Sequence, residues 1–264
     1  KMMVAAAGLE TGTIDEKTIY SCPGGYTLGG RLYKCMHIHG SVDVLTSIEK
    51  SCNTFYYRLA INIGLANWHD YSYKLGFGHK TGLDIGGEIN GLAPDKAYYD
   101  RAFGKGRWKE SGMVINLGIG QGELSVTPLQ LAHYAAMLAN YGTTYAPHLA
   151  RGYIDTRKKR VVKFDFKKVD SGISRKTFEI IREGMRRVVE GYGTARHIKI
   201  EGIEIAGKTG TAQNPHGENH ALFIGFAPFD NPKIAVAVIV ENAGFGGTHA
   251  APVAKRVFET YLSK

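Results

Sequence analysis

The stretch Ile205-Ala206-Gly207-Lys208-Thr209-Gly210-Thr211-Ala212-Gln213 opens the part of the sequence that decides the fold. Two more apolar, β-branched runs follow it, over residues 220–227 and 233–241. The three runs are separated by the turn sequences Asn-Pro-His-Gly (214–217) and Asp-Asn-Pro (230–232). Apolar runs joined by short polar turns predict an antiparallel, three-stranded meander.

Helical patterns precede and follow this predicted sheet. The sequence predicts helices over residues 1–10, 42–63 with a break near Ser51, 128–140, from 175 onward, and 251–262. Gly64 is the expected end of the second helix, and the Gly-rich segment 91–112 is expected to be a mobile loop. Helices, then a sheet, then a helix indicate one α+β domain over residues 1–264, with an antiparallel sheet flanked by helices.

The composition is typical of one large globular domain or two small ones, with 264 residues that are 44% hydrophobic and 22% charged. The longest aliphatic stretch, residues 234–240, is far shorter than the roughly 18 residues that a membrane-spanning helix needs. A net charge of +9 would suit a polyanionic partner, but the densest basic run, Arg157–Arg160, is typical of a solvated hairpin turn. We expect no nucleic-acid partner, because aromatic and basic residues do not interleave.

Three short motifs have residue types that can carry chemistry. Lys208-Thr209-Gly210, on a predicted strand, can bind a carboxylate, because the ammonium and hydroxyl groups hold an anion and the glycine leaves the backbone accessible. Ser51-Cys52-Asn53, at the helix break, can point a hydroxyl and a carboxamide into one cleft, although a helix-capping Ser or Asn gives the same pattern. Lys1 stands 50 residues before Ser51 and leads a helix that begins without a capping residue. A serine three positions before Lys1 would share its helix face and could lose its proton to the lysine amine, so we expect such a serine in a preceding part of the protein.

The order and spacing of these motifs resemble the Ser-x-x-Lys, Ser-x-Asn and Lys-Thr-Gly signature of penicillin-binding proteins and serine β-lactamases. The likeness extends over nearly the whole chain, through Gly118–Gly122, Thr127–Ala132, Ala206–Gln213 and Phe223–Pro228. In these stretches the sequence is similar to the transpeptidase domain of class B penicillin-binding proteins. It is most similar to the elongation-type penicillin-binding protein 2 family, which works with the rod-shape polymerase.

The resemblance implies a role for each motif residue. Lys1 would be the general base for the serine, Ser51 would relay the proton to the leaving amine, and Asn53 would hydrogen-bond the acyl-donor peptide and Lys1. The Lys208-Thr209 pair would bind the substrate carboxylate, and the backbone N–H of Thr211 would form an oxyanion hole with that of the serine. Lys208 would also lower the pKa of Lys1 by its charge.

The implied reaction is acyl transfer in two steps. The serine attacks the penultimate carbonyl of a D-Ala-D-Ala stem peptide and releases D-alanine, and an amine of a neighbouring stem peptide then takes the acyl group. β-Lactams would acylate the same serine. The resemblance also implies a role in cell elongation and shape at the periplasmic face of the cytoplasmic membrane, with an N-terminal membrane anchor. Its partners would be a rod-shape glycan polymerase and elongation scaffold proteins.

Cys22, Cys35, His39 and Cys52 are suitable ligands for tetrahedral zinc, although their spacing is not a common finger pattern. A single disulfide plus a free thiol, or three unrelated buried thiols, are alternatives, and His37 could replace His39. Elongation-type enzymes of this family are similar in having a zinc site of His, Cys and Asp at comparable places. In this sequence cysteines replace the aspartates. The resemblance thus implies a structural zinc ion that anchors the catalytic loop through Cys52.

Two other functions share these motifs. A serine β-lactamase needs a separate water-activating base, but the nearest Glu-x-x-x-Asn arrangement, Glu49 to Asn53, overlaps the Ser-x-Asn motif. A β-lactam-sensing receptor domain is acylated without turnover, and only upstream sequence would separate it from an enzyme. We therefore predict a serine-type D-Ala-D-Ala transpeptidase and keep these two functions as alternatives.

Overall fold

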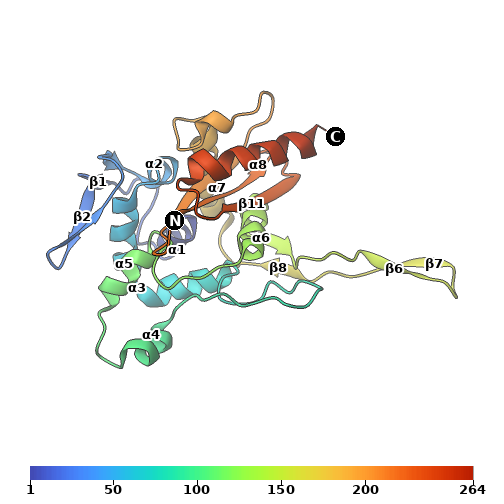
Figure 1. Cartoon of the computed structure of the whole chain (residues 1–264), viewed down its shortest axis with the longest axis horizontal. Helices are drawn as coiled ribbons and strands as arrows, with labels where there is room; N and C mark the ends of the chain where they lie inside the picture. The colour runs from blue at the N-terminus through green and yellow to red at the C-terminus, as the bar shows by residue number, and fades with distance from the viewer. Residues whose placement is uncertain (264) are drawn as a thin grey trace.

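An antiparallel sheet covered by helices forms the centre of the computed structural model, which describes residues 1–263 (Figure 1). Its strands are β9 (Ala206–Ala212), β10 (His220–Ala227) and β11 (Ile234–Val240), in the order β11-β10-β9. Lys208 on β9 pairs with Ile224 on β10, which fixes the register. The predicted meander is confirmed. Within residues 1–263, β9 has a strand partner on one side only, so the Lys-Thr-Gly motif lies on an edge strand.

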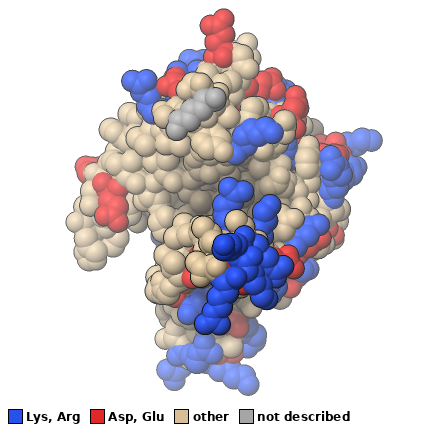
Figure 2. All heavy atoms as spheres, turned by 90° about the vertical axis from the view of Figure 1, so that its right-hand side faces the viewer, with Lys and Arg blue, Asp and Glu red and all other residues tan. Residues whose placement is uncertain are grey.

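Four two-stranded pairs lie outside this sheet: β1 (Tyr20–Cys22) with β4 (Gly40–Val42), β2 (Gly25–Leu28) with β3 (Arg31–Lys34), β5 (Thr143–Tyr145) with β8 (Lys168–Asp170), and β6 (Gly152–Asp155) with β7 (Arg160–Lys163). The β6–β7 pair confirms the predicted hairpin turn at Arg157–Arg160 and projects away from the rest of the molecule (Figure 1). Figure 2 looks towards the end of this hairpin and shows Lys and Arg side chains gathered there. No helix in the described part of the chain is long and apolar enough to cross a membrane.

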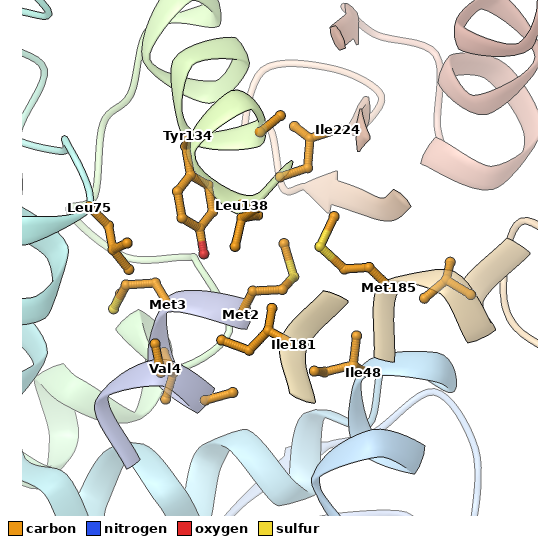
Figure 3. Packing of buried hydrophobic residues seen from close by; sticks show 14 of the residues in the cluster. Met2, Met3, Val4, Ile48, Leu75, Tyr134, Leu138, Ile181, Met185 and Ile224 are labelled. Atoms are coloured by element: carbon orange, nitrogen blue, oxygen red, sulfur yellow. The ribbon is translucent and has the colours of Figure 1, made fainter. Parts of the chain in front are cut away.

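The helix α1 (Met2–Glu10) lies at the centre of the helical part, and it is apolar all round because it is buried on nearly every side. Figure 3 shows its residues Met2 and Met3 packed near Tyr134 and Leu138 of α6 (Pro128–Ala139) and near Met185 of α7 (Arg175–Glu190). Burial of each methionine side chain contributes about 1.5–3 kcal/mol. This packing fixes Lys1, at the start of α1, relative to α6 and α7, which themselves pack on the sheet.

The predicted helix over residues 42–63 is broken at Ser51, as expected, into α2 (Val44–Glu49) and α3 (Asn53–Lys74). Gly64 ends the first helical part of α3, as predicted, because its φ of 73° and ψ of 170° are not helical. A second helical part follows this kink and continues to Lys74. The carboxylate of Glu110 accepts a hydrogen bond from the Leu65 N–H (2.7 Å) and thus satisfies a backbone donor that the kink frees.

The segment 91–112, expected to be a loop, contains α4 (Lys96–Phe103) and the start of α5 (Glu110–Leu117), so that prediction is wrong. Asp95 caps α4 by accepting a hydrogen bond from the Tyr98 N–H (2.6 Å). Tyr99 is buried, and its hydroxyl donates to Glu123 (2.7 Å). A contact across 24 residues of sequence therefore stabilises α4.

The last helix, α8 (Gly246–Leu262), begins earlier than the predicted residue 251. A Cβ atom at Gly246 would lie 2.2 Å from the carbonyl oxygens of both Gly210 and Leu222. Only glycine therefore allows the helix to begin directly against β9 and β10. The close approach places the start of α8 beside the Lys-Thr-Gly motif.

Candidate active site

The structure brings together Lys1, Ser51, Asn53 and Lys208, which are far apart in the sequence. Lys1 Nζ donates hydrogen bonds to Ser51 Oγ (2.8 Å), the Ser51 carbonyl oxygen (2.9 Å) and Asn53 Oδ1 (2.7 Å). Lys208 Nζ donates to the same Ser51 Oγ (2.9 Å) and to the Thr209 carbonyl oxygen (2.9 Å). The hydroxyl of Ser51 therefore lies between two lysine amines.

Ser51 reaches this place because the backbone turns sharply between α2 and α3. Its φ of 57° is in the left-handed region, which costs a serine about 1–3 kcal/mol. The Ser51 N–H donates to the Ile48 carbonyl (3.2 Å) and the Cys52 N–H to the Ser47 carbonyl (3.0 Å), so the end of α2 holds the turn. Asn53 begins α3, and both Ser51 and Asn53 meet Lys1 while Cys52 is buried.

Burial changes the protonation of both lysines. It lowers the pKa of Lys1 to about 8, although the nearby thiol groups of Cys35 and Cys52 act in the opposite direction. Burial also lowers the pKa of Lys208 well below its usual value, and the charge of Lys1 adds to this effect. We expected the charge of Lys208 to lower the pKa of Lys1. The repulsion between the two amines instead lowers the pKa of Lys208. With this pKa, Lys1 is neutral in about one molecule in ten at pH 7.

The open edge of β9 carries the remaining motif residues, Thr209, Gly210 and Thr211. The hydroxyl oxygens of Thr209 and Thr194 lie 2.7 Å apart, and Gln121 Nε2 donates to the Thr211 carbonyl (3.0 Å). The Gly246 N–H donates to Thr211 Oγ1 (3.4 Å). Sequence reasoning gave no role to Gln121, although it stands in a Gly-rich motif, and it missed Thr194, which no local pattern marks.

The two sides of the site are linked through the loop after α7. The Tyr192 N–H donates to Glu49 (2.9 Å), and Lys50 Nζ donates to the Tyr192 carbonyl (3.0 Å). Glu49 and Lys50 directly precede Ser51, and Tyr192 is two residues before Thr194. The Ser-x-Asn turn and the partner of Thr209 are thus held by the same short loop.

Cys22, Cys35, His39 and Cys52, named here the Cys3His cluster, have donor atoms that all lie within 4.8 Å of one another. His39 Nδ1 is 3.5 Å from the sulfur atoms of both Cys22 and Cys35, and all three cysteines are free thiols. Zn–S and Zn–N bonds of about 2.3 and 2.0–2.1 Å give donor separations of about 3.3–3.8 Å in a tetrahedral site, so this donor set fits zinc. The Cys22 thiol donates a hydrogen bond to the backbone carbonyl of His37 (3.6 Å), but the imidazole ring of His37 is not part of the cluster.

The Cys3His cluster is attached directly to the Ser-x-Asn motif. The Asn53 N–H donates to the sulfur of Cys35 (3.2 Å). A hydrogen bond from the Cys52 thiol lowers the pKa of Cys35 to about 3, which favours a thiolate, the form that binds metal. Because Cys52 stands between Ser51 and Asn53, a displacement of this sulfur would move both neighbours.

Comparison with known proteins agrees with this geometry. The model of the penicillin-binding protein transpeptidase domain matches residues 1–259. Peptidoglycan D,D-transpeptidase MrdA of Acinetobacter baumannii is 36% identical over 99% of this chain, which spans 41% of that relative. Penicillin-binding protein 2 (PBP2) of Pseudomonas aeruginosa in complex with WCK 5153 has a TM-score of 0.88 and 37% identity, with coverage of 100% of this chain and 57% of that chain.

PBP2 of Helicobacter pylori in complex with MreC has a TM-score of 0.86 and 29% identity, over 99% of this chain and 48% of that chain. The chain thus spans less than two thirds of each of these relatives. The α+β fold with an antiparallel sheet flanked by helices is confirmed, as is the resemblance carried by the motifs. The chain belongs to the transpeptidase domain family of the penicillin-binding proteins.

Proposed function

We propose that this chain is the catalytic part of a serine-type peptidoglycan D,D-transpeptidase, acylated on a serine three positions before Lys1. The observation that carries the proposal is Ser51 Oγ held between two lysine amines at 2.8 and 2.9 Å. This arrangement connects a base to a second hydroxyl through hydrogen bonds, and acyl transfer needs such a path for its proton. The family match and the transpeptidase relatives support the same activity.

In the acylation step, Lys1 would take the proton of the serine while the serine oxygen attacks the penultimate D-Ala carbonyl. The proton would then pass from Lys1 through Ser51 Oγ to the amine of the departing D-alanine, as the peptide C–N bond breaks. An acceptor amine would reverse this proton path and take the acyl group. With a pKa of about 8, Lys1 is neutral in about one molecule in ten at pH 7, which is enough for a base.

The substrate would bind along the edge of β9 in an extended conformation. Lys208 and Thr209 would hold its terminal carboxylate, with the Thr209 hydroxyl oriented by Thr194. The N–H of Thr211 would stabilise the oxyanion, and Gln121, bonded to the Thr211 carbonyl, would keep that peptide group in place. β-Lactams would occupy the same edge and acylate the same serine.

We further propose that the Cys3His cluster binds a structural zinc ion. Two observations support this: the four donor atoms lie close together, and the cysteines at positions 22, 35 and 52 are free thiols rather than a disulfide. Zinc would fix the thiolates of Cys35 and Cys52 and thereby the orientation of Ser51 and Asn53. It would take no part in bond making.

The cellular role that fits the relatives is cell elongation and shape, at the extracytoplasmic face of the cytoplasmic membrane. The protein would be held there by an N-terminal anchor. An MreC-like scaffold is a candidate partner because the H. pylori relative forms a complex with MreC. A membrane glycan polymerase is another, because a related structure is that of a peptidoglycan synthase complex that coordinates polymerisation and crosslinking.

Intact mass spectrometry of the full-length protein with a penicillin, followed over hours, tests the activity. A stable adduct on the serine three positions before Lys1 is expected. Rapid return to the unmodified mass would instead indicate a β-lactamase, and absence of any adduct would contradict the proposed nucleophile. Release of D-alanine from a D-Ala-D-Ala peptide, with an amino acid as acceptor, separates an enzyme from a sensor domain.

A further inference from the structure

The β6–β7 hairpin with its flanking residues, 151–164, is named here the arm, and it lies far from the active site (Figure 1). Ile154 and Val161 pair directly across the two strands and share one face, and they are 71% and 67% exposed. Tyr153 and Phe164 lie on the opposite face with ring centroids 6.0 Å apart, and they are 54% and 43% exposed. The arm thus presents large apolar side chains to solvent on both of its faces.

Such a structure is incomplete by itself. A two-stranded hairpin is marginally stable in water, and exposed clusters of large apolar side chains often mark interaction sites. Within residues 1–263, β6 and β7 pair only with each other, so each has an unpaired outer edge. A groove with a volume of about 420 Å³ runs along the arm, lined by Tyr153, Ile154, Val161 and Phe164 among others. These features indicate that another polypeptide covers the arm.

The charge of the arm indicates the chemistry of that polypeptide. Within the arm, six of the fourteen residues are Lys or Arg and only one is Asp. All six basic residues are exposed, and none forms an ion pair with any residue in 1–263. Figure 2 shows the resulting cluster at the end of the arm. A partner with acidic side chains would neutralise this cluster, and a basic one would be repelled.

We propose that the arm binds an acidic protein segment in an extended conformation, which adds as a third strand to one of its open edges. A strand places alternate side chains on the two faces of a sheet, so one segment can cover apolar groups on both faces. A flat anionic membrane could cover only one face. A second copy of this chain would bring the same positive charge to the contact.

The test uses the full-length protein and a fluorescent heptapeptide with glutamate at its first, fourth and seventh positions and valine elsewhere, which as a strand carries valine on both faces. The same peptide with lysine in place of glutamate is the matched probe. Fluorescence anisotropy should show binding of the acidic peptide, weakened by added salt, and none of the basic peptide. The tip variant R157E/K158E/K159E/R160E should bind it at least about tenfold more weakly, because several charge pairs are lost together. The face variant I154S/V161S should also bind more weakly, although it keeps every charge.

K105E/R107E/K109E, which reverses an exposed basic loop between α4 and α5, should bind as the native protein does. All variants should be acylated by penicillin at the native rate, which shows that they are folded. Equal binding of both peptides, or no effect of the tip variant, would overturn the proposal. Preferential binding to phosphatidylglycerol vesicles, or concentration-dependent dimers that the face variant abolishes, would overturn it in favour of a lipid surface or a second copy.

Discussion

The protonation of Lys1 should determine how the acylation rate depends on pH. Only the neutral amine can accept the serine proton, and burial lowers the pKa of Lys1 from 10.5 to about 8. The neutral fraction therefore increases as pH rises, from about 1% at pH 6 through about 9% at pH 7 to about 50% at pH 8. The acylation rate constant should rise about 50-fold from pH 6 to pH 8 and then level off. A lysine with the usual pKa would give a rise that continues to about pH 10.

The measurement is the rate constant of adduct formation with a penicillin between pH 5.5 and 9.5 at constant ionic strength, by rapid quenching and intact mass spectrometry. Lys1→Arg is the control, because its guanidinium stays protonated throughout. It should lower the rate constant by about 10²–10⁴-fold and remove the rise between pH 6 and pH 8. Circular dichroism establishes that the variant is folded. A native profile that is flat in this interval, or an unchanged profile in Lys1→Arg, would refute Lys1 as the base.

Three further predictions concern the zinc ion, the start of α8 and the partner of Thr209. Removal of metal by a strong chelator and desalting should lower the melting temperature and slow acylation at least about tenfold, and added zinc should restore both. Metal analysis before this treatment should give about one zinc per chain. Gly246→Ala should lower the free energy of unfolding in urea by more than about 2 kcal/mol, because the new Cβ would lie 2.2 Å from two carbonyl oxygens. The control Gly112→Ala, whose Cβ would have no atom within 4 Å, should change it by less than about 1 kcal/mol. Thr194→Val should raise KM for a D-Ala-D-Ala substrate several-fold and leave kcat nearly unchanged, because the hydrogen bond to Thr209 is lost. Thr194→Ser should restore KM, and a fall in kcat alone would contradict this role.

Local signals in the sequence were sufficient wherever a short segment determines its own structure. Thr127 and Pro128 predicted the start of α6, and the structure has a capping box there that Gln130 completes. The turns that separate β9, β10 and β11 were equally clear. Contacts between distant residues were not predictable: the backbone donor freed at Gly64 is satisfied by Glu110, which the sequence places 45 residues away from Leu65.

The same distinction applies to the site. The motif residues could be found because their types and order are unusual, and the Cys3His cluster because the sequence has only three cysteines, all within its first 52 residues. Thr194 and Gln121 are common residue types, and their contacts with Thr209 and Thr211 span 15 and 90 residues of sequence. Only the folded chain shows that these two residues adjoin the motif.

The hydroxyl of Ser51 accepts hydrogen bonds from Lys1, 50 residues earlier in the sequence, and from Lys208, 157 residues later. No contiguous fragment holds this centre. It exists only after α1 is enclosed and α7 has packed against both α2 and β9. Contacts between residues so distant in the sequence form slowly during folding. A fluorescent penicillin would therefore report on the integrity of the whole domain. In a living cell it would label correctly folded molecules and leave misfolded ones unlabelled.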